Sequence, residues 1–286
     1  MRHGFLLIDK PTGPTSHDVV QMVRKTLNES KAGHLGTLDP AASGLLVVAV
    51  GAKALKVIEY FQHLTKEYEA TIHFGAASST YDREGVIEAV ETKPGWIEPD
   101  LLHVRRMIED RFLGRTSQTP PAYSAVHIDG KRAHELARSG ANVTMPTRDV
   151  EIEKCEILSY DYPTLTLDVL CSSGTYIRSL AHDLGDMLRC GAYLESLRRI
   201  KVGEWSVENA ISPDKVNWTD VVPLKEILRD FRAIEVSESE AADIKLGKKI
   251  PKEIKPDTLA WFDGLPIAFL VPSKDGSRTA HARKVL

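Results

Sequence analysis

Two short apolar segments and a long glycine-rich loop limit the fold of this chain more than any other feature. The segments FLLID at 5–9 and GLLVVAV at 44–50 are too short for buried helices and rich in branched side chains, so each is predicted to be a buried strand. The second strand follows the stretch 31–44, which holds three glycines and one proline and has neither a helical nor a strand period. We therefore expect an irregular loop lying between core elements.

A helix is predicted between the first strand and this loop. Ser16 follows the Pro/Gly segment KPTGPT and is predicted to be the N-cap residue. Apolar side chains then recur at helical spacing as Val19, Val20, Val23 and Leu27. The chain thus begins with a strand, a loop and an amphipathic helix.

Both periods continue further along the chain. Strands are predicted at 66–74, 86–90, 149–160 and 164–171, and helices at 52–63, 99–112 and 175–189. The segment 119–140 is predicted to hold a strand, an Asp129-Gly130 turn and a basic helix. Because these elements do not alternate regularly, they favour an α+β fold, with a mixed, mostly antiparallel central sheet and flanking helices.

The chain length suits a large domain followed by a small one. At 286 residues we expect a domain at 1–230 and a second at 231–286. The second ends in two apolar strands around Asp263-Gly264, which predicts a small β-rich module. It carries ten Lys and Arg against eight Asp and Glu, whereas the whole chain has a net charge of −3, so any basic surface must be local.

Several classes of protein have no support in the sequence. The longest apolar run is far below the ~18 residues of a membrane span, and no signal-peptide core precedes the first charge, so we expect a cytoplasmic protein. Cys155, Cys171 and Cys190 form no C-x-x-C pair, which indicates reduced thiols. The motifs of nucleotide hydrolysis, dinucleotide redox chemistry and zinc binding are absent.

The loop at 31–44 holds the first candidates for chemistry. Asp39 in GTLDP lies just ahead of a buried strand, where a carboxylate can be held rigidly at a sheet edge. His34 adds a titratable base to the same loop. Each also has an ordinary interpretation, since Asp before Pro is a common turn residue and a lone loop histidine is usually solvated.

The segment CSSGTYIRSLAHDLG holds the second group of candidates. A strand runs into a glycine turn and then a helix whose start carries Tyr176 and Arg178. Free backbone N–H groups, a cation and an aromatic ring at one helix start suit an anion or a nucleotide. The alternative is a helix capped by Thr175 with Arg178 on the surface.

Two strands supply weaker candidates. Tyr68 alternates with Ala70 and Ile72, so core packing is its default interpretation. Leu197 is followed by Arg198, Arg199 and Lys201, which indicates either an edge facing RNA or a solvated strand end.

Taken together, five segments make the chain resemble a known family. They are GFLLIDKPTGPTSHDVV, AGHLGTLDPAASGLLVVAVG, KEYEATIHFG, TPPAYSAVHIDGKRAHELAR and SSGTYIRSLAHDLG. In this order and spacing they closely resemble the TruB family of tRNA pseudouridine synthases over about residues 3–210. The C-terminal segment more weakly resembles the PUA-type RNA-binding module of that family, through AWFDGLPIAFLV and its basic end.

The resemblance implies the pseudouridine synthase fold and isomerisation of a uridine in the TΨC loop of tRNA. Carried over by position, Asp39 is the essential catalytic carboxylate and Arg178 pairs with it. Lys10 and Pro11 buttress the catalytic loop. The order of the chemical steps, whether attack on the ribose C1′, addition to the base or removal of a ribose proton, stays open.

The resemblance also implies that the target base is flipped out of the RNA into the site. Tyr68 then stacks on the uracil, and Tyr176 and Leu197 line the pocket. His34 fills the space that the flipped nucleotide leaves.

The resemblance implies neither a cofactor nor a metal ion, and a monomer that acts on the T-arm of tRNA with no guide RNA, membrane or obligate protein partner. Two alternatives remain. One is a protein that binds or folds tRNA without catalysis, and the other is the same chemistry within a guide-RNA-dependent complex.

Overall fold

The computed structural model describes residues 3–124, 126–128, 130–138, 144–275 and 277–286. Its strands are β1 (Gly4–Lys10), β2 (Ala32–Leu35), β3 (Ser43–Val50), β4 (Lys66–Phe74), β5 (Ala76–Ser78), β6 (Ile87–Ala89), β7 (Gly114–Gln118), β8 (His127–Ile128), β9 (Lys131–Arg132), β10 (Arg148–Asp161), β11 (Thr164–Cys171), β12 (Ala192–Val202), β13 (Trp205–Ser206), β14 (Val222–Pro223), β15 (Ala233–Glu235), β16 (Thr258–Phe262), β17 (Leu265–Pro272) and β18 (Ala280–Val285). Its helices are α1 (Ser16–Leu27), α2 (Ala52–Val57), α3 (Leu101–Arg111), α4 (Ala133–Arg138), α5 (Ile177–Met187), α6 (Leu224–Ile227) and α7 (Glu238–Lys245), with the 3₁₀ helices η1 (Ile58–Phe61), η2 (Val207–Asn209) and η3 (Trp218–Asp220).

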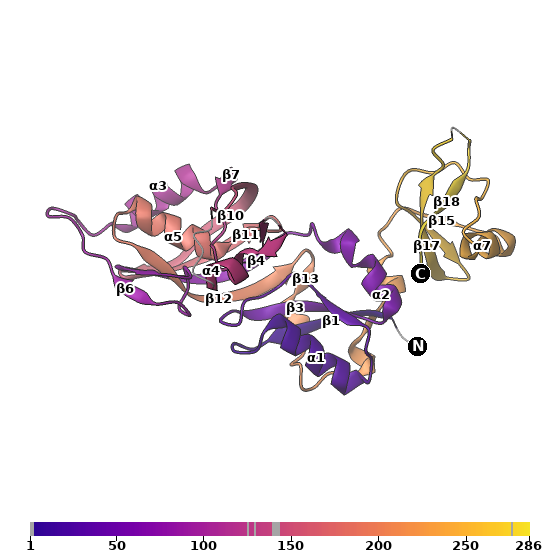
Figure 1. Ribbon diagram of the computed structural model, residues 1–286, viewed down its shortest axis with the longest axis horizontal. Helices are drawn as coiled ribbons and strands as arrows, with labels where there is room; N and C mark the ends of the chain where they lie inside the picture. The colour runs from indigo at the N-terminus through magenta and orange to yellow at the C-terminus, as the bar shows by residue number, and fades with distance from the viewer. Residues whose placement is uncertain (1–2, 125, 129, 139–143, 276) are drawn as a thin grey trace.

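One large sheet organises most of the chain (Figure 1). Its strands follow the order β14-β1-β3-β12-β4-β11-β10-β7, with β2 paired to β3 and β13 paired to β12. Within the described residues every pair in this sheet is antiparallel except β3 and β12, which run parallel over two residue pairs. The α+β fold with a mixed, mostly antiparallel sheet is therefore confirmed.

Helices cover one face of this sheet along much of its length. Buried side chains from α1, α3 and α5 join those of β1, β3, β4 and β11 in one apolar cluster. The opposite face of β1 and β3 packs against α2, η1 and α6 in a second cluster. The strands β1 and β3 are thus buried on both faces, which explains their continuous apolar sequences.

The predicted faces of α1 and β4 are confirmed, but the predicted cap of α1 is wrong. Thr15 is the N-cap residue, because its side chain accepts a hydrogen bond from the Asp18 backbone N–H while the Asp18 carboxylate accepts one from the Thr15 N–H. Ser16 is the first helical residue, and its hydroxyl turns inward to the backbone of Leu38.

The stretch 31–44 is more ordered than its sequence indicates. Its first part forms β2, which pairs antiparallel with β3, so only residues 36–42 are loop. His34 therefore lies on a strand, opposite Val48. Apolar and polar residues do not alternate along β2. Its backbone pairing with β3, and not the burial of one face, holds this strand in place.

The arginine-rich strand β12 is not an edge strand, and Arg199 on it is not solvated, so both interpretations of its position are wrong. Contact of this strand with RNA stays a prediction. Strand β12 lies in the middle of the sheet between β3 and β4. Arg199 is 1% exposed, whereas Arg198 points to the other face and pairs with Asp9. Alternation along one strand thus separates two adjacent arginines into a buried and a half-exposed environment.

The segment between β7 and β10 contains the small hairpin of β8 and β9, followed by α4. The predicted turn includes Asp129, which lies outside the described residues. No helix in the described part of the chain is long and apolar enough to cross a membrane.

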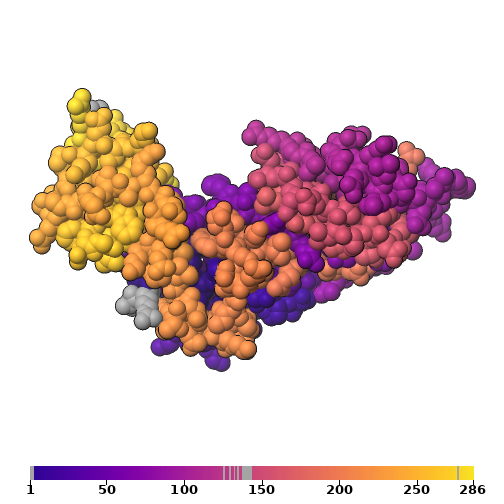
Figure 2. All heavy atoms as spheres, turned by 180° about the vertical axis from the view of Figure 1, so that it is seen from behind, coloured from indigo at the N-terminus to yellow at the C-terminus, as the bar shows by residue number. Residues whose placement is uncertain are grey.

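The last strands form a separate small sheet at one end of the molecule (Figure 1). Strands β15, β16, β17 and β18 pair in that order, and α7 packs beside them. The two strands predicted around Asp263-Gly264 are β16 and β17. Figure 2 shows this module as a lobe, with a wide hollow between it and the lobe that carries α3. The division at residue 230 stays a prediction.

The C-terminal module shares a core with the large sheet. Leu259 and Phe269 of the module are fully buried in the same cluster as Phe5 of β1. The Tyr60 ring of η1 stacks on Phe269, with ring centroids 4.0 Å apart. The module therefore stabilises the strands that carry the site described below.

We expect Phe269→Ala to lower the free energy of unfolding of the whole chain by about 3–5 kcal/mol, because it removes a buried ring and leaves a cavity. Denaturant unfolding of the full chain measures this change. Leu265→Ala in the same strand is the control, since Leu265 is 56% exposed. Equal stability of the two variants would contradict a shared core.

Candidate active site

The loop that carries Asp39 is held by hydrogen bonds from three directions. The buried ammonium of Lys10 donates to the carbonyl oxygens of Ala42 and Pro11 at 2.7 and 2.9 Å. Gly13 N donates to the Pro40 carbonyl at 2.9 Å. On the other side, the Ser16 hydroxyl bonds both the N–H and the carbonyl of the residue before Asp39. The backbone around Asp39 is therefore fixed.

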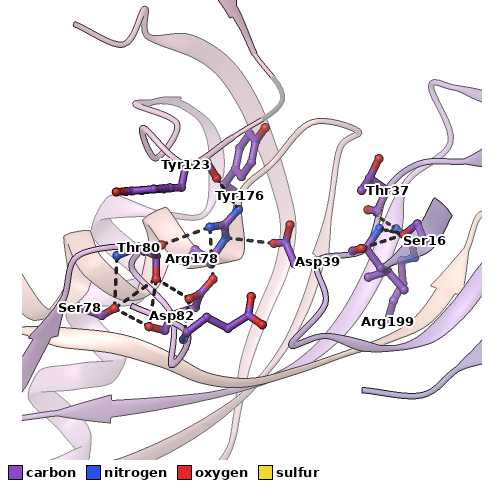
Figure 3. Close-up of polar contacts among 12 residues, drawn as sticks. Ser16, Thr37, Asp39, Ser78, Thr80, Asp82, Tyr123, Tyr176, Arg178 and Arg199 are labelled. Atoms are coloured by element: carbon purple, nitrogen blue, oxygen red, sulfur yellow. Dashed lines mark hydrogen bonds and ion pairs between the residues drawn. The ribbon is translucent and has the colours of Figure 1, made fainter. Parts of the chain in front are cut away.

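Arg178 faces Asp39 from the first turn of α5 (Figure 3). Its Nε lies 3.1 Å from Asp39 Oδ2, at an angle that makes the contact an ion pair rather than a linear hydrogen bond. The Arg178 side chain is 7% exposed and that of Asp39 is 40% exposed. The interpretation of Arg178 as a surface residue is therefore wrong, and the carboxylate is the part of the pair that solvent and substrate can reach.

The rest of the Arg178 guanidinium is held by the turn 78–85 and by the backbone of Tyr123. Nη1 lies 3.2 Å from Asp82 Oδ2 and donates to the Thr80 carbonyl at 3.2 Å. Nη2 donates to the Tyr123 carbonyl, also at 3.2 Å. The planar guanidinium thus bridges two carboxylates and two backbone carbonyls, which leaves it one orientation.

Asp82 is itself fixed, and the sequence analysis did not identify it. Its buried carboxylate accepts hydrogen bonds from the Thr80 hydroxyl at 2.6 Å and from the Glu84 N–H at 3.0 Å. Burial, together with Asp82 and Asp39, raises the pKa of Glu84. The guanidinium of Arg178 has more donors than one carboxylate can accept, so a second acceptor could have been expected. The only signal in the sequence for Asp82 as that acceptor is its position in the turn-rich STYDREG segment.

A narrow cleft opens at the Asp39–Arg178 pair. Asp39, Asp82 and Arg178 line it together with Leu197 of β12. Tyr176 lies next to the cleft, with Arg178 5.9 Å from its ring centroid and Arg148 at 4.5 Å.

Three other candidates lie outside the lining of this cleft. Tyr68 is 8% exposed, and burial raises the pKa of its hydroxyl, so its ring is largely covered in this structure. Pro11 is exposed beside Lys10. His34 is half-buried on β2, its Nδ1 makes no hydrogen bond within the described residues, and burial and Arg199 lower its pKa. Both effects favour the neutral form of the His34 imidazole.

Within the described residues, no group of three or more His, Cys, Asp or Glu side chains lies close enough to hold a metal ion. The cleft presents a rigid carboxylate and a buried guanidinium that fixes it and opposes its charge.

Two family models match most of the chain. Residues 24–177 match the model of the TruB family pseudouridylate synthase N-terminal domain, and residues 178–229 match that of the tRNA pseudouridylate synthase B C-terminal domain. The chain is therefore a pseudouridine synthase. It belongs to the TruB family.

Curated relatives agree with this assignment. The chain is 48% identical to tRNA pseudouridine synthase B of Syntrophomonas wolfei over 219 aligned residues. The alignment covers 75% of this chain and 71% of that protein. The chain is 40% identical over 265 residues to tRNA pseudouridine synthase B of Corynebacterium diphtheriae, covering 88% and 86%. Among solved structures, a chain of a Cbf5-Nop10-Gar1 complex matches with a TM-score of 0.71 and 25% identity, over 99% of this chain and 84% of that one.

Proposed function

We propose that this enzyme converts a uridine in the TΨC loop of tRNA into pseudouridine, with Asp39 as the catalytic carboxylate and without a guide RNA. The observation that carries the proposal is the Asp39–Arg178 ion pair at the cleft. In the overall reaction the bond from N1 of uracil to C1′ breaks, a bond from C5 to C1′ forms, and a proton is lost from C5 while N1 gains one.

The electrostatics of the pair suit this reaction. Asp39 is exposed enough to meet the nucleotide, while Arg178 and Asp82 are almost completely buried. The buried guanidinium opposes the charge of the carboxylate and holds it in one orientation while the detached uracil turns. No cofactor takes part in the proposal, because the isomerisation needs no oxidant, reductant or external group.

A uridine inside a folded RNA loop cannot present both its C1′ and its C5 to one carboxylate, so the target base must be flipped out. Unstacking the uridine from the RNA costs a few kcal/mol, and contacts between the base and the cleft offset this cost. We assign Leu197 and Tyr176 to the walls of the cleft and Tyr68 to stacking on the uracil. Since Tyr68 is largely covered, its stacking requires the cleft to widen when RNA enters.

Substrate and partners follow the same proposal. The names of the curated relatives support tRNA as the substrate. The C-terminal module, residues 231–286, is assigned to RNA binding as a PUA-like domain, and its excess of basic residues supports contact with phosphates. We assign the enzyme as a monomer that needs no protein partner.

Release of tritium from [5-³H]uridine in unmodified tRNA by the purified chain alone tests this proposal. We expect release of one tritium per tRNA, lost when the T-loop uridine is replaced by cytidine. Release only after a guide RNA is added would overturn guide independence. Binding of tRNA without any release would favour a tRNA-folding protein.

We expect His34→Ala to slow turnover on a structured T-loop hairpin much more than on a substrate whose target uridine is already unstacked. A neutral, half-buried imidazole suits filling the gap left by a flipped base, so its loss affects flipping more than bond rearrangement. Single-turnover rates on both substrates measure this, with the exposed His63→Ala as the control. An equal loss on both substrates would instead indicate a catalytic base.

A further inference from the structure

A buried cation lies beneath the Asp39 loop, and the proposed reaction does not use it. Arg199 of β12 is 1% exposed and is the largest fully buried side chain among the described residues. Within those residues no carboxylate pairs with it, in contrast to Arg198, whose guanidinium contacts Asp9 at 2.9 Å. Burial of a charge without an ion-pair partner costs several kcal/mol. The hydrogen bonds that Arg199 makes must offset this cost, so they indicate what the side chain does.

Three hydrogen bonds of Arg199 go to backbone carbonyls at the two ends of the loop. Nη2 donates to Gly36 at 3.1 Å and Nη1 to Thr37 at 3.4 Å, just before Asp39. Nε donates to Leu45 at 2.7 Å, just after the loop. One side chain from β12 therefore bridges the entrance and the exit of the loop.

Arg199 also lies where β3 and β12 meet, the pair that joins β14, β1 and β3 to β4, β11, β10 and β7 in the large sheet. The parallel contact between β3 and β12 consists of the pairs Ser43 with Arg198 and Gly44 with Arg199. Gly44 has a φ of 99°, and a Cβ there would lie 2.3 Å from the Arg199 carbonyl oxygen. Only glycine permits this approach, so the backbones touch at this point.

The same strand carries other parts of the site. Arg199 is the register partner of Tyr68 on β4, and Leu197 is the partner of Ala70. Because residues two apart on a strand share a face, Arg199 and Leu197 lie on the face of β12 that borders the cleft. The hydrogen bonds of Arg199 thus connect the strand that carries Leu197 with the backbone just before Asp39.

We propose that Arg199 is a positioning residue whose guanidinium fixes Gly36 and Thr37 against β12 and so holds the Asp39 carboxylate at Arg178. It touches no reacting atom, and its role rests on the proposed function of Asp39. A displacement of about 1 Å in reacting geometry costs about 10²-fold in rate, so a loose loop slows the chemical step.

Two substitutions of Arg199 distinguish the role of its planar guanidinium from the role of its positive charge. Arg199→Lys keeps the positive charge but cannot reach three carbonyls at once, and Arg199→Gln keeps a donor but loses the charge. Arg198→Lys is the matched control, because Arg198 is adjacent and faces away from the loop. Single-turnover tritium release at saturating tRNA, tRNA affinity and melting temperature are measured for each, with rates taken well below melting and per folded molecule.

We expect both Arg199 variants to be slower by about 10²-fold, with tRNA affinity within about threefold and Arg198→Lys close to wild type. A normal rate for Arg199→Lys would overturn positioning by the fork and indicate that the charge alone acts. Equal losses of rate and affinity would overturn it in favour of general support of the fold. If Arg199→Gln does not fold, Arg199→Lys against Arg198→Lys decides the question.

Failure of this proposal is distinct from failure of the proposed function. An inactive Asp39→Asn together with a fully active Arg199→Lys removes only the role of Arg199. An active Asp39→Asn removes the proposed role of Asp39 itself.

Discussion

Replacement of Asp39 by Asn is expected to lower turnover by more than about 10⁴-fold while tRNA affinity stays within several-fold. The amide is nearly isosteric, but it carries no charge to act on the reacting nucleotide or to pair with Arg178. Contacts to phosphates, which dominate RNA affinity, do not involve this single side chain. Single-turnover tritium release and filter binding with the same tRNA measure the two quantities.

Asp110→Asn is the matched control for this substitution. Asp110 is an exposed carboxylate on α3, and its replacement is expected to leave the rate unchanged. A rate for Asp39→Asn within tenfold of wild type would show that another group carries out the chemistry. A parallel loss of affinity and rate would place Asp39 in binding instead.

Arg178→Lys is expected to lower the rate at saturating tRNA by about 10²–10³-fold. The guanidinium contacts Asp39, Asp82 and the carbonyls of Thr80 and Tyr123 at 3.1 to 3.2 Å. An ammonium has no planar fork and satisfies one carboxylate at the expense of the other. The remaining donors and the orientation of Asp39 are therefore lost, although the charge is kept.

The comparison is made with Arg83→Lys, because Arg83 is exposed in the turn that holds Asp82. We expect Arg83→Lys to turn over at nearly the wild-type rate. If added guanidinium ion restores much of the rate of an Arg178→Ala variant, this would further support a requirement for the planar guanidinium group at this position. A near-normal rate for Arg178→Lys would mean that only its charge is needed.

Much of the local structure could be predicted from the sequence. The alternation of Tyr68, Ala70 and Ile72 determined which face of β4 is buried, and the spacing of Val19 and Val23 did the same for α1. These patterns are reliable because burial of one face imposes a period of 2 on a strand and of 3.6 on a helix. The resemblance to the TruB family, rather than any local pattern, predicted that Asp39 and Arg178 belong to one site.

The arrangement around those two residues could not be predicted in the same way. Asp39 and Arg178 lie 139 positions apart, and their contact depends on the order of strands in the sheet. The placement of β12 in the middle of the sheet turned Arg199 from an expected surface residue into a buried one. Asp82 was missed because an acidic residue in a turn has the same local pattern whether or not a buried cation faces it.

The sequence by itself thus determined the α+β class and the faces of the main elements, and through its family resemblance it predicted the two central residues of the candidate site. Only the tertiary structure decided that Arg178 bridges two carboxylates, that Arg199 links both ends of the Asp39 loop, and that the C-terminal module shares a core with β1. The physical reason is that periodicity records which face of an element is buried, whereas hydrogen bonds and ion pairs of buried polar groups depend on elements that are distant along the chain.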